Sequence, residues 1–186
     1  QTSLINANAG IQPVKVDKEI YALIERSIAI SKITQGAFDI TYGSIDKSLW
    51  NFDKNMKRLP SKEDALKMVH LINYNNIIMD PVATTVFLKE KGMRIGFGGI
   101  GKGYAAEMAK ALLLNKGVTS GIINASGDLT SWGTQPNGKQ WTIGIANTDQ
   151  PSSAFSYLEI SGKAIATSGN YETYILINGK KYSHTI

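Results

Sequence analysis

The stretch IGFGGIGKGYAAEMAKALL, residues 95–113, carries residue types that could hold a phosphate group. Its glycines Gly96, Gly98 and Gly101 match the dinucleotide-binding pattern G-x-G-x-x-G. The segment from Gly96 to Lys102 also matches the first seven positions of the phosphate loop G-x-x-x-x-G-K. Two nucleotide-binding hypotheses follow, and each makes a further demand on the sequence.

Neither demand is met. A dinucleotide fold needs an acidic residue at the end of the next strand, but that predicted strand ends at Asn124, and Asp128 lies beyond a turn. The phosphate loop needs Ser or Thr after its lysine, and this chain has Gly103. What remains is a glycine turn that opens a helix, where backbone N–H groups and Lys102 favour an anion. Alternatively, the glycines only let the helix pack closely on a sheet, and Lys102 points into water.

The two histidines have different expected roles. His184 belongs to the last alternating strand pattern, so its imidazole could lie beside whatever the glycine turn holds. The alternative is an ordinary strand histidine. His70 lies between Val69 and Leu71 on a predicted helix and is expected to be structural. His184 is therefore the candidate for chemistry.

Hydroxyl groups gather in two further stretches. ATSGNY, residues 166–171, places Thr167, Ser168 and Gly169 at the end of a strand, where hydroxyls could orient a ligand, although the same residues favour an ordinary turn. GAFDITYGS, residues 36–44, places Asp39 and Thr41 beside aromatic residues that could stack on a planar ring. That loop could equally be held by its own side chains.

The composition limits the classes of function. The chain has 186 residues and a net charge of +5, but its lysines are spread along it, which favours anionic small molecules over a nucleic-acid groove. It has no cysteine, so disulfides, thiolate metal sites and a cysteine nucleophile are excluded. No stretch approaches the roughly 20 apolar residues of a transmembrane helix. Because residue 1 is Gln, the chain is expected to be cut from a longer product.

The elements that must position these residues follow from hydrophobic periodicity. A helix is predicted from Asp17 to about Lys32, and a second after Pro60, where Ser61 and Asp64 begin a capping-box pattern. A third helix is predicted over residues 102–115, ended by Lys116-Gly117, and Asn178-Gly179 predicts a hairpin turn. The predicted strands cover residues 76–80, 84–90, 93–98, 140–147, 153–160, 163–169, 171–177 and 180–186, and residues 120–129 are predicted as a buried strand that ends in a polar turn. This pattern predicts an α+β fold with mainly antiparallel sheets and packed helices.

Five stretches, in this order and spacing, resemble the ApbE family of FAD:protein FMN transferases. The family pattern runs GAFDPTVGPL…W, GGIAKGYAVD, N-x-GGD, ATSGxY and HI before DPxTG. The corresponding stretches in this chain are GAFDITYGS…LW (36–50), GGIGKGYAAE (98–107), NASGD (124–128), ATSGNY (166–171) and SHTI (183–186). The resemblance implies a single ApbE-like catalytic domain over residues 1–186. It also implies that the family's first strand, its export signal and the metal-binding DPxTG segment lie outside this chain.

The resemblance implies a reaction and a set of site residues. The enzyme would bind FAD and Mg²⁺ and transfer FMN to a Ser or Thr hydroxyl of a target protein, with release of AMP. His184 would take the proton of the attacking hydroxyl, and the backbone carbonyl of Gly101, where the family has Ala, would contact the metal. Residues expected to bind FAD are Asp39, Thr41, Gly98, Gly99, Lys102, Glu107, Thr167, Ser168 and Gly169.

Two departures and several alternatives accompany this expectation. Gly96 stands where the family commonly has Asp, and Glu107 stands where it has Asp on the following helix. An FAD pyrophosphatase uses water in place of the protein hydroxyl, and a non-catalytic FAD-binding protein does not turn FAD over. A nucleoside-triphosphate hydrolase is disfavoured by Gly103. Family members are mostly exported and often lipid-anchored, so the bacterial cell envelope is the expected location.

Overall fold

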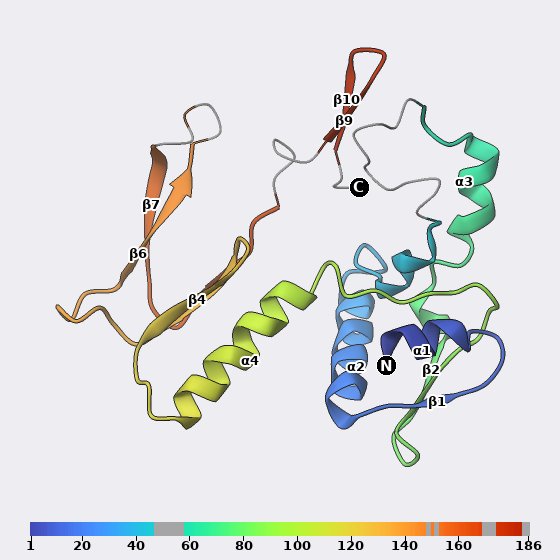
Figure 1. Ribbon diagram of the computed structural model, residues 1–186, viewed down its shortest axis with the longest axis horizontal. Helices are drawn as coiled ribbons and strands as arrows, with labels where there is room; N and C mark the ends of the chain where they lie inside the picture. The colour runs from blue at the N-terminus through green and yellow to red at the C-terminus, as the bar shows by residue number, and fades with distance from the viewer. Residues whose placement is uncertain (47–57, 148–149, 151–152, 169–173, 184–186) are drawn as a thin grey trace. The chain divides into compact units, whose positions relative to one another are not determined.

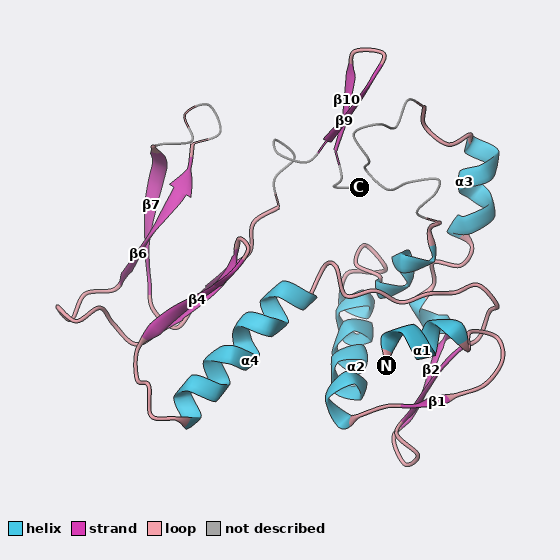
Figure 2. Ribbon diagram, viewed as in Figure 1, coloured by secondary structure: helices cyan, strands magenta, loops and turns pink. Residues whose placement is uncertain are grey.

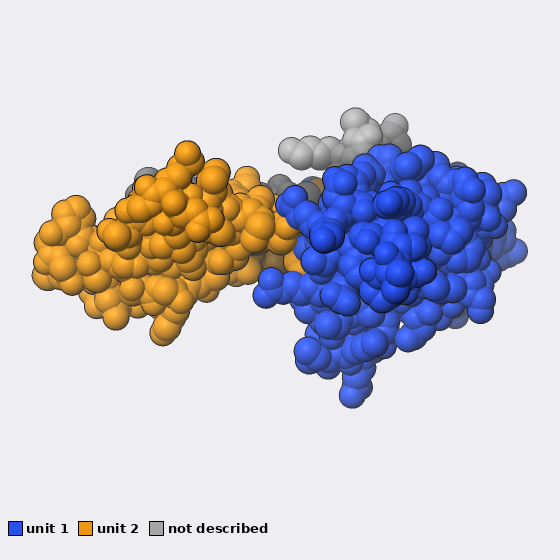
Figure 3. Space-filling view, turned by 90° about the horizontal axis from the view of Figure 1, so that it is seen from below, with its two compact units in different colours: residues 1–99, 175–182 blue, residues 100–174, 183–186 orange. Residues whose placement is uncertain are grey.

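The computed structural model describes residues 1–46, 58–147, 150, 153–168 and 174–183, and divides the chain into two compact units. The first unit contains residues 1–99 and 175–182, and the second contains residues 100–174 and 183–186. Figure 3 distinguishes the two units by colour. The boundary at residues 99 and 100 falls inside the glycine-rich stretch, so this stretch contributes residues to both units.

The first unit is built on a three-stranded antiparallel sheet with the order β1-β3-β2, of which Figure 1 labels β1 and β2. Val86 of the central strand lies opposite Val14 on one side and Met79 on the other. Over residues 1–99, the elements of this unit are α1 (Thr2–Ala7), β1 (Val14–Lys15), α2 (Lys18–Ile33), η1 (Ile40–Ser44), α3 (Lys62–Val69), η2 (Tyr74–Asn76), β2 (Ile77–Asp80) and β3 (Thr85–Leu88). Its core consists of buried apolar residues, among them Ile5, Ile24, Ile40, Val86, Leu88 and Met93.

The predicted helices of the first unit are confirmed. Helix α2 begins after Asp17 and buries the stripe that includes Leu23 and Ile24, as its periodicity indicates. Helix α3 begins after Ser61, whose hydroxyl accepts a hydrogen bond from the Asp64 N–H at 3.1 Å. That bond satisfies one of the N–H groups left free at a helix start. The local capping signals therefore located both helix starts.

The predicted strand over residues 93–98 is wrong. Its backbone runs alongside other segments without entering a ladder, because side chains replace the neighbouring strand. The amide of Asn6 donates to Ile95 O at 3.0 Å and accepts from Ile95 N at 2.8 Å. The Ser44 hydroxyl exchanges bonds with Arg94 N and O, and Gly96 N donates to Ile40 O at 2.9 Å. An alternating pattern fits this segment because it is half-buried, whether or not its partner is a strand.

The second unit combines one long helix with two small antiparallel sheets (Figure 2). Its elements are α4 (Gly101–Asn115), β4 (Gly121–Ala125), β5 (Asp128–Trp132), β6 (Trp141–Ala146), β7 (Ala154–Ile160) and β8 (Ala164–Ile165). One sheet has the order β4-β5-β8 and the other is the pair β6-β7. Gly121 lies opposite Trp132, and a Cβ on this glycine would stand 2.6 Å from the indole ring, so the pairing requires glycine at this position.

Several predictions for the second half of the chain are confirmed and two need correction. Helix α4 is capped by Lys116, and Gly117 has the left-handed φ of +84° that a helix end favours. Asn178 and Gly179 both have positive φ and join β9 (Tyr174–Ile177) to β10 (Lys180–Ser183). The stretch 120–129, predicted as a buried strand that ends in a polar turn, is the strand β4 followed by a turn and the start of β5, as predicted, but β4 is only half-buried. The predicted strand over 163–169 is reduced to the two residues of β8.

The structure confirms the α+β class, with antiparallel pairing in every described ladder. The loop over residues 36–44 contains the 3₁₀ helix η1. Within the part of the chain that the structure describes, no helix is both long and apolar enough to cross a membrane.

Candidate functional site

Three of the five stretches meet in the second unit at the start of α4. We call this the helix-start cluster: Gly101–Gly103 at the helix start, the turn 124–128 between β4 and β5, and Thr167 after β8. The Lys102 ammonium donates a hydrogen bond to Ser126 O at 3.0 Å. Its nitrogen also lies 3.7 Å from Asp128 Oδ1, an ion pair that is too long for a hydrogen bond. Lys102 is therefore held by the turn and does not point freely into water.

The turn itself is built from left-handed backbone and two side-chain bonds. Ser126 has φ of +58° and Gly127 has φ of +97°. The Asn124 side chain accepts a hydrogen bond from Gly127 N at 2.8 Å, and the Thr167 hydroxyl donates one to Gly127 O at 3.0 Å. A Cβ on Gly127 would stand 2.6 Å from Thr167 Oγ1, so both its φ and its contact favour glycine. Two side chains thus hold the turn: Asn124, which belongs to it, and Thr167, which follows β8.

Helix α4 begins at this cluster without a side-chain cap. Ile100 occupies the cap position, and the first intrahelical bond runs from Tyr104 N to Ile100 O at 3.0 Å. Helix geometry leaves the N–H groups of Gly101, Lys102 and Gly103 without an acceptor in the helix. These N–H groups and the positive end of the helix dipole favour a negatively charged group nearby. The arrangement has the chemistry of a phosphate site, with Lys102 as its full positive charge.

Glu107, predicted to bind FAD, links α4 to β5. Its Oε1 accepts a hydrogen bond from the Thr130 hydroxyl at 2.5 Å and lies 3.6 Å from the Lys110 ammonium. Lys110 also donates to the Thr130 hydroxyl at 3.3 Å, and the Thr130 side chain is buried. These contacts join the helix to the sheet beneath it. The Glu107 carboxylate is about half exposed, and its role in FAD binding stays a prediction.

Asp39 and Thr41 hold their own loop in the first unit. Asp39 Oδ1 accepts hydrogen bonds from Thr41 N at 2.8 Å and from the Thr41 hydroxyl at 2.6 Å. Asp39 Oδ2 accepts one from Tyr74 N at 2.9 Å, and the fully buried Thr41 hydroxyl accepts one from Asn73 N at 2.8 Å. The structure therefore supports the interpretation of a loop held by its own side chains. A contact of either residue with FAD stays a prediction.

Gly98 and Gly99 lie against the aromatic residues of the same loop. A Cβ on Gly98 would stand 2.6 Å from the hydroxyl oxygen of Tyr42, and a Cβ on Gly99 would stand 3.2 Å from the ring of Phe38. Both glycines are therefore in close contact with aromatic side chains of this loop. The first unit thus brings together the stretches GAFDITYGS and GG at residues 98–99, which lie far apart in the sequence.

Two predicted site residues, His184 and Gly169, lie outside the described residues, as does Trp50 of the first stretch. Ser168 is described and exposed, next to Thr167. Asp128 was not among the predicted site residues, although it lies beside Lys102. The signal that could have found it is the NASGD stretch, which pairs an acidic residue with a left-handed turn.

The described residues provide few of the ligands that a metal site needs. Within the described ranges, no group of three or more His, Cys, Asp or Glu side chains lies close enough to hold a metal ion. The Gly101 carbonyl belongs to the first residue of α4, and the nearby Asp128 carboxylate faces Lys102. By themselves these groups do not fit a complete Mg²⁺ site, so no chemical step is derived through a metal.

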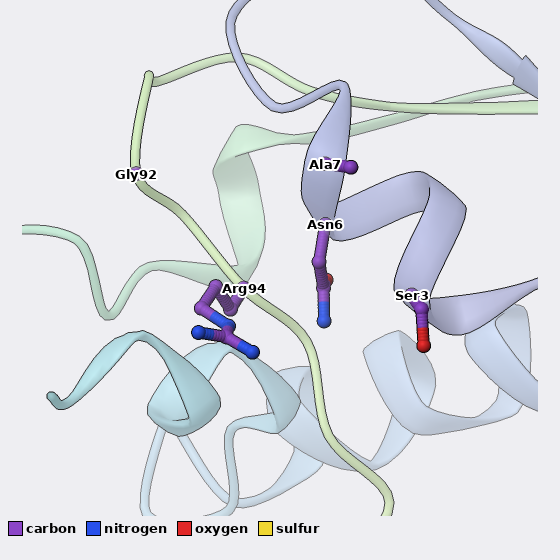
Figure 4. Close-up of a pocket in the computed structure, with 5 residues that line it drawn as sticks. All are labelled: Ser3, Asn6, Ala7, Gly92 and Arg94. Carbon is purple, nitrogen blue, oxygen red and sulfur yellow. The ribbon is translucent and has the colours of Figure 1, made fainter. Parts of the chain in front are cut away.

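A pocket of about 330 Å³ lies in the first unit (Figure 4). It is lined by Ser3, Asn6, Ala7, Gly92 and Arg94. The Asn6 amide in its wall is already bonded to the backbone of Ile95. Among the described residues, none of those predicted to bind FAD lines this pocket.

Comparison with known proteins identifies the family. The model of the ApbE family matches residues 1–186. The chain is 31% identical over 183 residues to an FAD:protein FMN transferase of Klebsiella pneumoniae (strain 342), covering 98% of this chain and 56% of that protein. It is 27% identical over 186 residues to an FAD:protein FMN transferase of Escherichia coli (strain K12), covering 97% of this chain and 53% of that protein. The chain thus spans about half the length of these relatives.

Solved structures agree with the sequence match. The ApbE protein from Thermotoga maritima superposes with a TM-score of 0.88 at 32% identity, over 98% of this chain and 59% of that chain. The apo form of the flavinyl transferase ApbE of Pseudomonas stutzeri gives a TM-score of 0.82 at 28% identity, over 100% of this chain and 57% of that chain. The fold and the whole-chain family match lead to one conclusion: the chain belongs to the ApbE family.

Proposed function

We propose that the protein transfers FMN from FAD to a Ser or Thr hydroxyl of a target protein and releases AMP. Family membership and the names of the relatives support flavin transfer. The observation that carries the proposal furthest is the helix-start cluster, in which Lys102 and the first N–H groups of α4 lie beside the turn 124–128. That combination suits the diphosphate of FAD, which carries its negative charge between two organic halves.

The residues of this chain would bind and orient the diphosphate. The N–H groups of residues 101–103 would donate to its oxygens, and the Lys102 ammonium would offset its charge. Such fixed donors stabilise the extra negative charge that develops on the leaving phosphate, because they are already oriented before the reaction. Ser168 and Thr167 would contribute hydroxyl groups at the edge of the same cluster.

The proposed reaction is a substitution at the phosphorus of the FMN half. The target hydroxyl oxygen forms a bond to that phosphorus, the bond to the bridging oxygen breaks, and AMP leaves with that oxygen. His184, as a neutral imidazole near pH 7, would accept the hydroxyl proton. Mg²⁺ is part of the proposal through the family resemblance, and when bound it would offset negative charge on the diphosphate.

The test is incubation of the protein with FAD, Mg²⁺ and a peptide that contains a candidate Ser or Thr acceptor. AMP is measured by chromatography and the peptide by mass spectrometry. Transfer predicts AMP together with a peptide that is heavier by FMN minus water. Free FMN and AMP with an unmodified peptide would show an FAD pyrophosphatase instead. Retention of FAD without AMP would show a non-catalytic FAD-binding protein.

We also propose the bacterial cell envelope as the location, a proposal that rests on the family resemblance. Fractionation of the source cells, followed by immunodetection of the protein, tests it. Recovery of the protein with cytoplasmic markers alone would contradict the proposal.

A further inference from the structure

The turn 124–128 holds the Lys102 side chain in place before any ligand arrives. Its ammonium has a hydrogen bond to Ser126 O at 3.0 Å and a carboxylate oxygen of Asp128 at 3.7 Å. The Lys102 side chain is nevertheless 46% exposed, so the ammonium keeps an open side. A lysine in this state can accept an anion without first being ordered.

Asp128 is itself firmly placed. It is the first residue of β5, it lies opposite Ala125 in the β4–β5 ladder, and its side chain is only 17% exposed. Its Oδ2 lies 4.0 Å from where a Cβ on Gly103 would stand, so the carboxylate borders the first turn of α4. The positive end of the helix dipole favours a negative charge at this place.

The Ser126 carbonyl is also fixed. The neighbouring Gly127 is bonded through its N–H to the Asn124 side chain and through its carbonyl to the Thr167 hydroxyl. The two oxygens that face Lys102 therefore come from the residues on either side of Gly127, whose N–H and C=O are both hydrogen-bonded. Rearrangement of the Lys102 side chain would break contacts to both oxygens.

We propose that Asp128 is a positioning residue that acts through Lys102 and tightens the binding of a diphosphate ligand. The inference rests on the proposed function, because it takes Lys102 as a ligand of the FAD diphosphate. Binding normally costs the rotamer freedom of a long side chain, and a lysine that is held beforehand avoids part of this cost. Asp128 would supply that restraint.

Electrostatic repulsion alone would change FAD affinity in the opposite direction. Asp128 carries a negative charge close to the proposed diphosphate, so its removal should tighten anion binding if charge alone matters. If Asp128 positions Lys102, its neutralisation should weaken binding although the site becomes more positive. The sign of the change therefore separates the two physical effects.

The experiment is titration calorimetry of FAD into four proteins: the wild type, Asp128→Asn, Lys102→Met and the double variant. We expect Lys102→Met to weaken FAD binding by about tenfold or more, as for loss of a charge-assisted hydrogen bond. Asp128→Asn should weaken it by about three- to tenfold, and in the Lys102→Met background it should change it less than about twofold. The matched control is Glu159→Gln, which removes the same charge from an exposed position on β7 and should leave affinity within about twofold.

Unchanged or tighter FAD binding in Asp128→Asn would overturn the inference and leave the proposed function intact. Additive losses in the double variant would also overturn it, because Asp128 would then not act through Lys102. A second measurement does not depend on FAD. Acetic anhydride should acetylate Lys102 at least about twofold faster in Asp128→Asn than in the wild type, since the ion pair shields the amine.

The acetylation rate is measured by peptide mass spectrometry, with the exposed Lys139 of the same unit as the internal reference. An unchanged Lys102 rate would overturn the positioning role even if FAD binds. A wild-type protein that binds no FAD, yet shows the faster Lys102 acetylation in Asp128→Asn, would overturn the proposed function alone. The positioning role of Asp128 and the proposed function can thus be contradicted independently of each other.

Discussion

At the scale of single residues, the polar side chains of this chain are used in pairs. Asp39 and Thr41 satisfy each other and two backbone N–H groups of η2 and its cap, and Lys102 and Asp128 meet across a turn. Such pairing is expected where polar groups are buried, because an unsatisfied donor or acceptor costs more than its bond gains. Substitutions at these residues therefore show which polar groups stabilise the fold and which are available to bind a ligand.

Thr41→Val tests the structural pair. The substitution removes the hydroxyl that donates to Asp39 at 2.6 Å and accepts from Asn73 N at 2.8 Å, in a fully buried position. We expect the free energy of unfolding to fall by about 1–3 kcal/mol, because two buried groups lose their partner. Urea unfolding followed by circular dichroism measures it. Thr85→Val on β3 is the control and should change stability by less than about 0.5 kcal/mol; an equal loss in both variants would contradict the prediction.

At the scale of elements, side chains supply backbone hydrogen bonds that a neighbouring strand would otherwise supply. The Asn6 amide on α1 reaches Ile95, 89 residues away in sequence, and satisfies both its N–H and its C=O. Residues 93–98 therefore lie beside α1 and η1 without belonging to a sheet. This placement brings residues 98 and 99 against the aromatic side chains of the 36–44 loop.

Asn6→Ala should remove this connection. The Ile95 N–H and C=O would lose their partner in a largely buried environment, at a cost of about 1–3 kcal/mol in the free energy of unfolding. Hydrogen exchange of the Ile95 amide should also become faster, which native-state exchange monitored by NMR can measure. Ser3→Ala, at an exposed position of the same helix, should leave both quantities nearly unchanged. Unaltered exchange at Ile95 in Asn6→Ala would show that another group holds this segment.

The N-terminal cap of α3 should influence how the stability of the protein depends on pH. The Ser61 hydroxyl donates to Asp64 Oδ2 at 2.7 Å, and this bond, followed by Lys67, holds the pKa of Asp64 below its ordinary value. A carboxylate whose folded pKa is lowered stabilises the fold at pH values above its unfolded pKa, and this contribution is lost as the pH falls through the folded pKa. Ser61→Ala should therefore raise the pKa of Asp64 toward its ordinary value and weaken the acid dependence of stability.

NMR titration of the Asp64 carboxyl carbon measures this change. The cap substitution should also cost about 1 kcal/mol of stability at neutral pH through loss of the bond to Asp64 N. Lys67→Met is the comparison: it removes both the hydrogen bond and the charge of Lys67, so it should also raise the pKa of Asp64. An unchanged pKa of Asp64 in Ser61→Ala would contradict the prediction, because the Ser61 hydroxyl is then not a cause of the lowered pKa.

At the scale of the whole molecule, the buried apolar side chains are concentrated in a cluster, whereas the positive charges are spread along the chain. Buried apolar side chains of the first unit form one cluster, whereas the net charge of +5 comes from lysines spread along the chain. A distributed positive charge attracts anions over a distance that salt shortens, about 10 Å at 0.1 M ionic strength and about 3 Å at 1 M. This distributed charge should therefore affect the association rate of an anionic ligand more than its dissociation rate.

FAD binding should accordingly weaken as salt rises. Under the proposed function, we expect the association rate of FAD to fall several-fold between about 0.05 M and 0.5 M NaCl, with a smaller change in the dissociation rate. Stopped-flow measurement of flavin fluorescence separates the two rates. Riboflavin, which lacks the phosphates, is the matched control and should show little dependence on salt. An FAD association rate that ignores salt would mean that only short-range contacts select the ligand.

Much of this protein follows from local sequence alone. The apolar stripe of α2, the Ser61 cap of α3, the glycine that ends α4 and the Asn178-Gly179 turn were predictable because each depends on residues only a few positions apart. The five stretches in order were also sufficient to indicate the ApbE family, which the match over residues 1–186 confirms.

Tertiary structure alone decided how those stretches meet. Hydrophobic alternation cannot tell a strand from a segment bonded to side chains, so the role of Asn6 at Ile95 was invisible in the sequence. The partners of Lys102 lie 24 and 26 positions away, and only the folding of β4 and β5 against α4 brings Ser126 and Asp128 to its ammonium. Periodicity and capping report short-range backbone preferences, whereas side-chain hydrogen bonds and ion pairs depend on distances that exist only after the chain has packed.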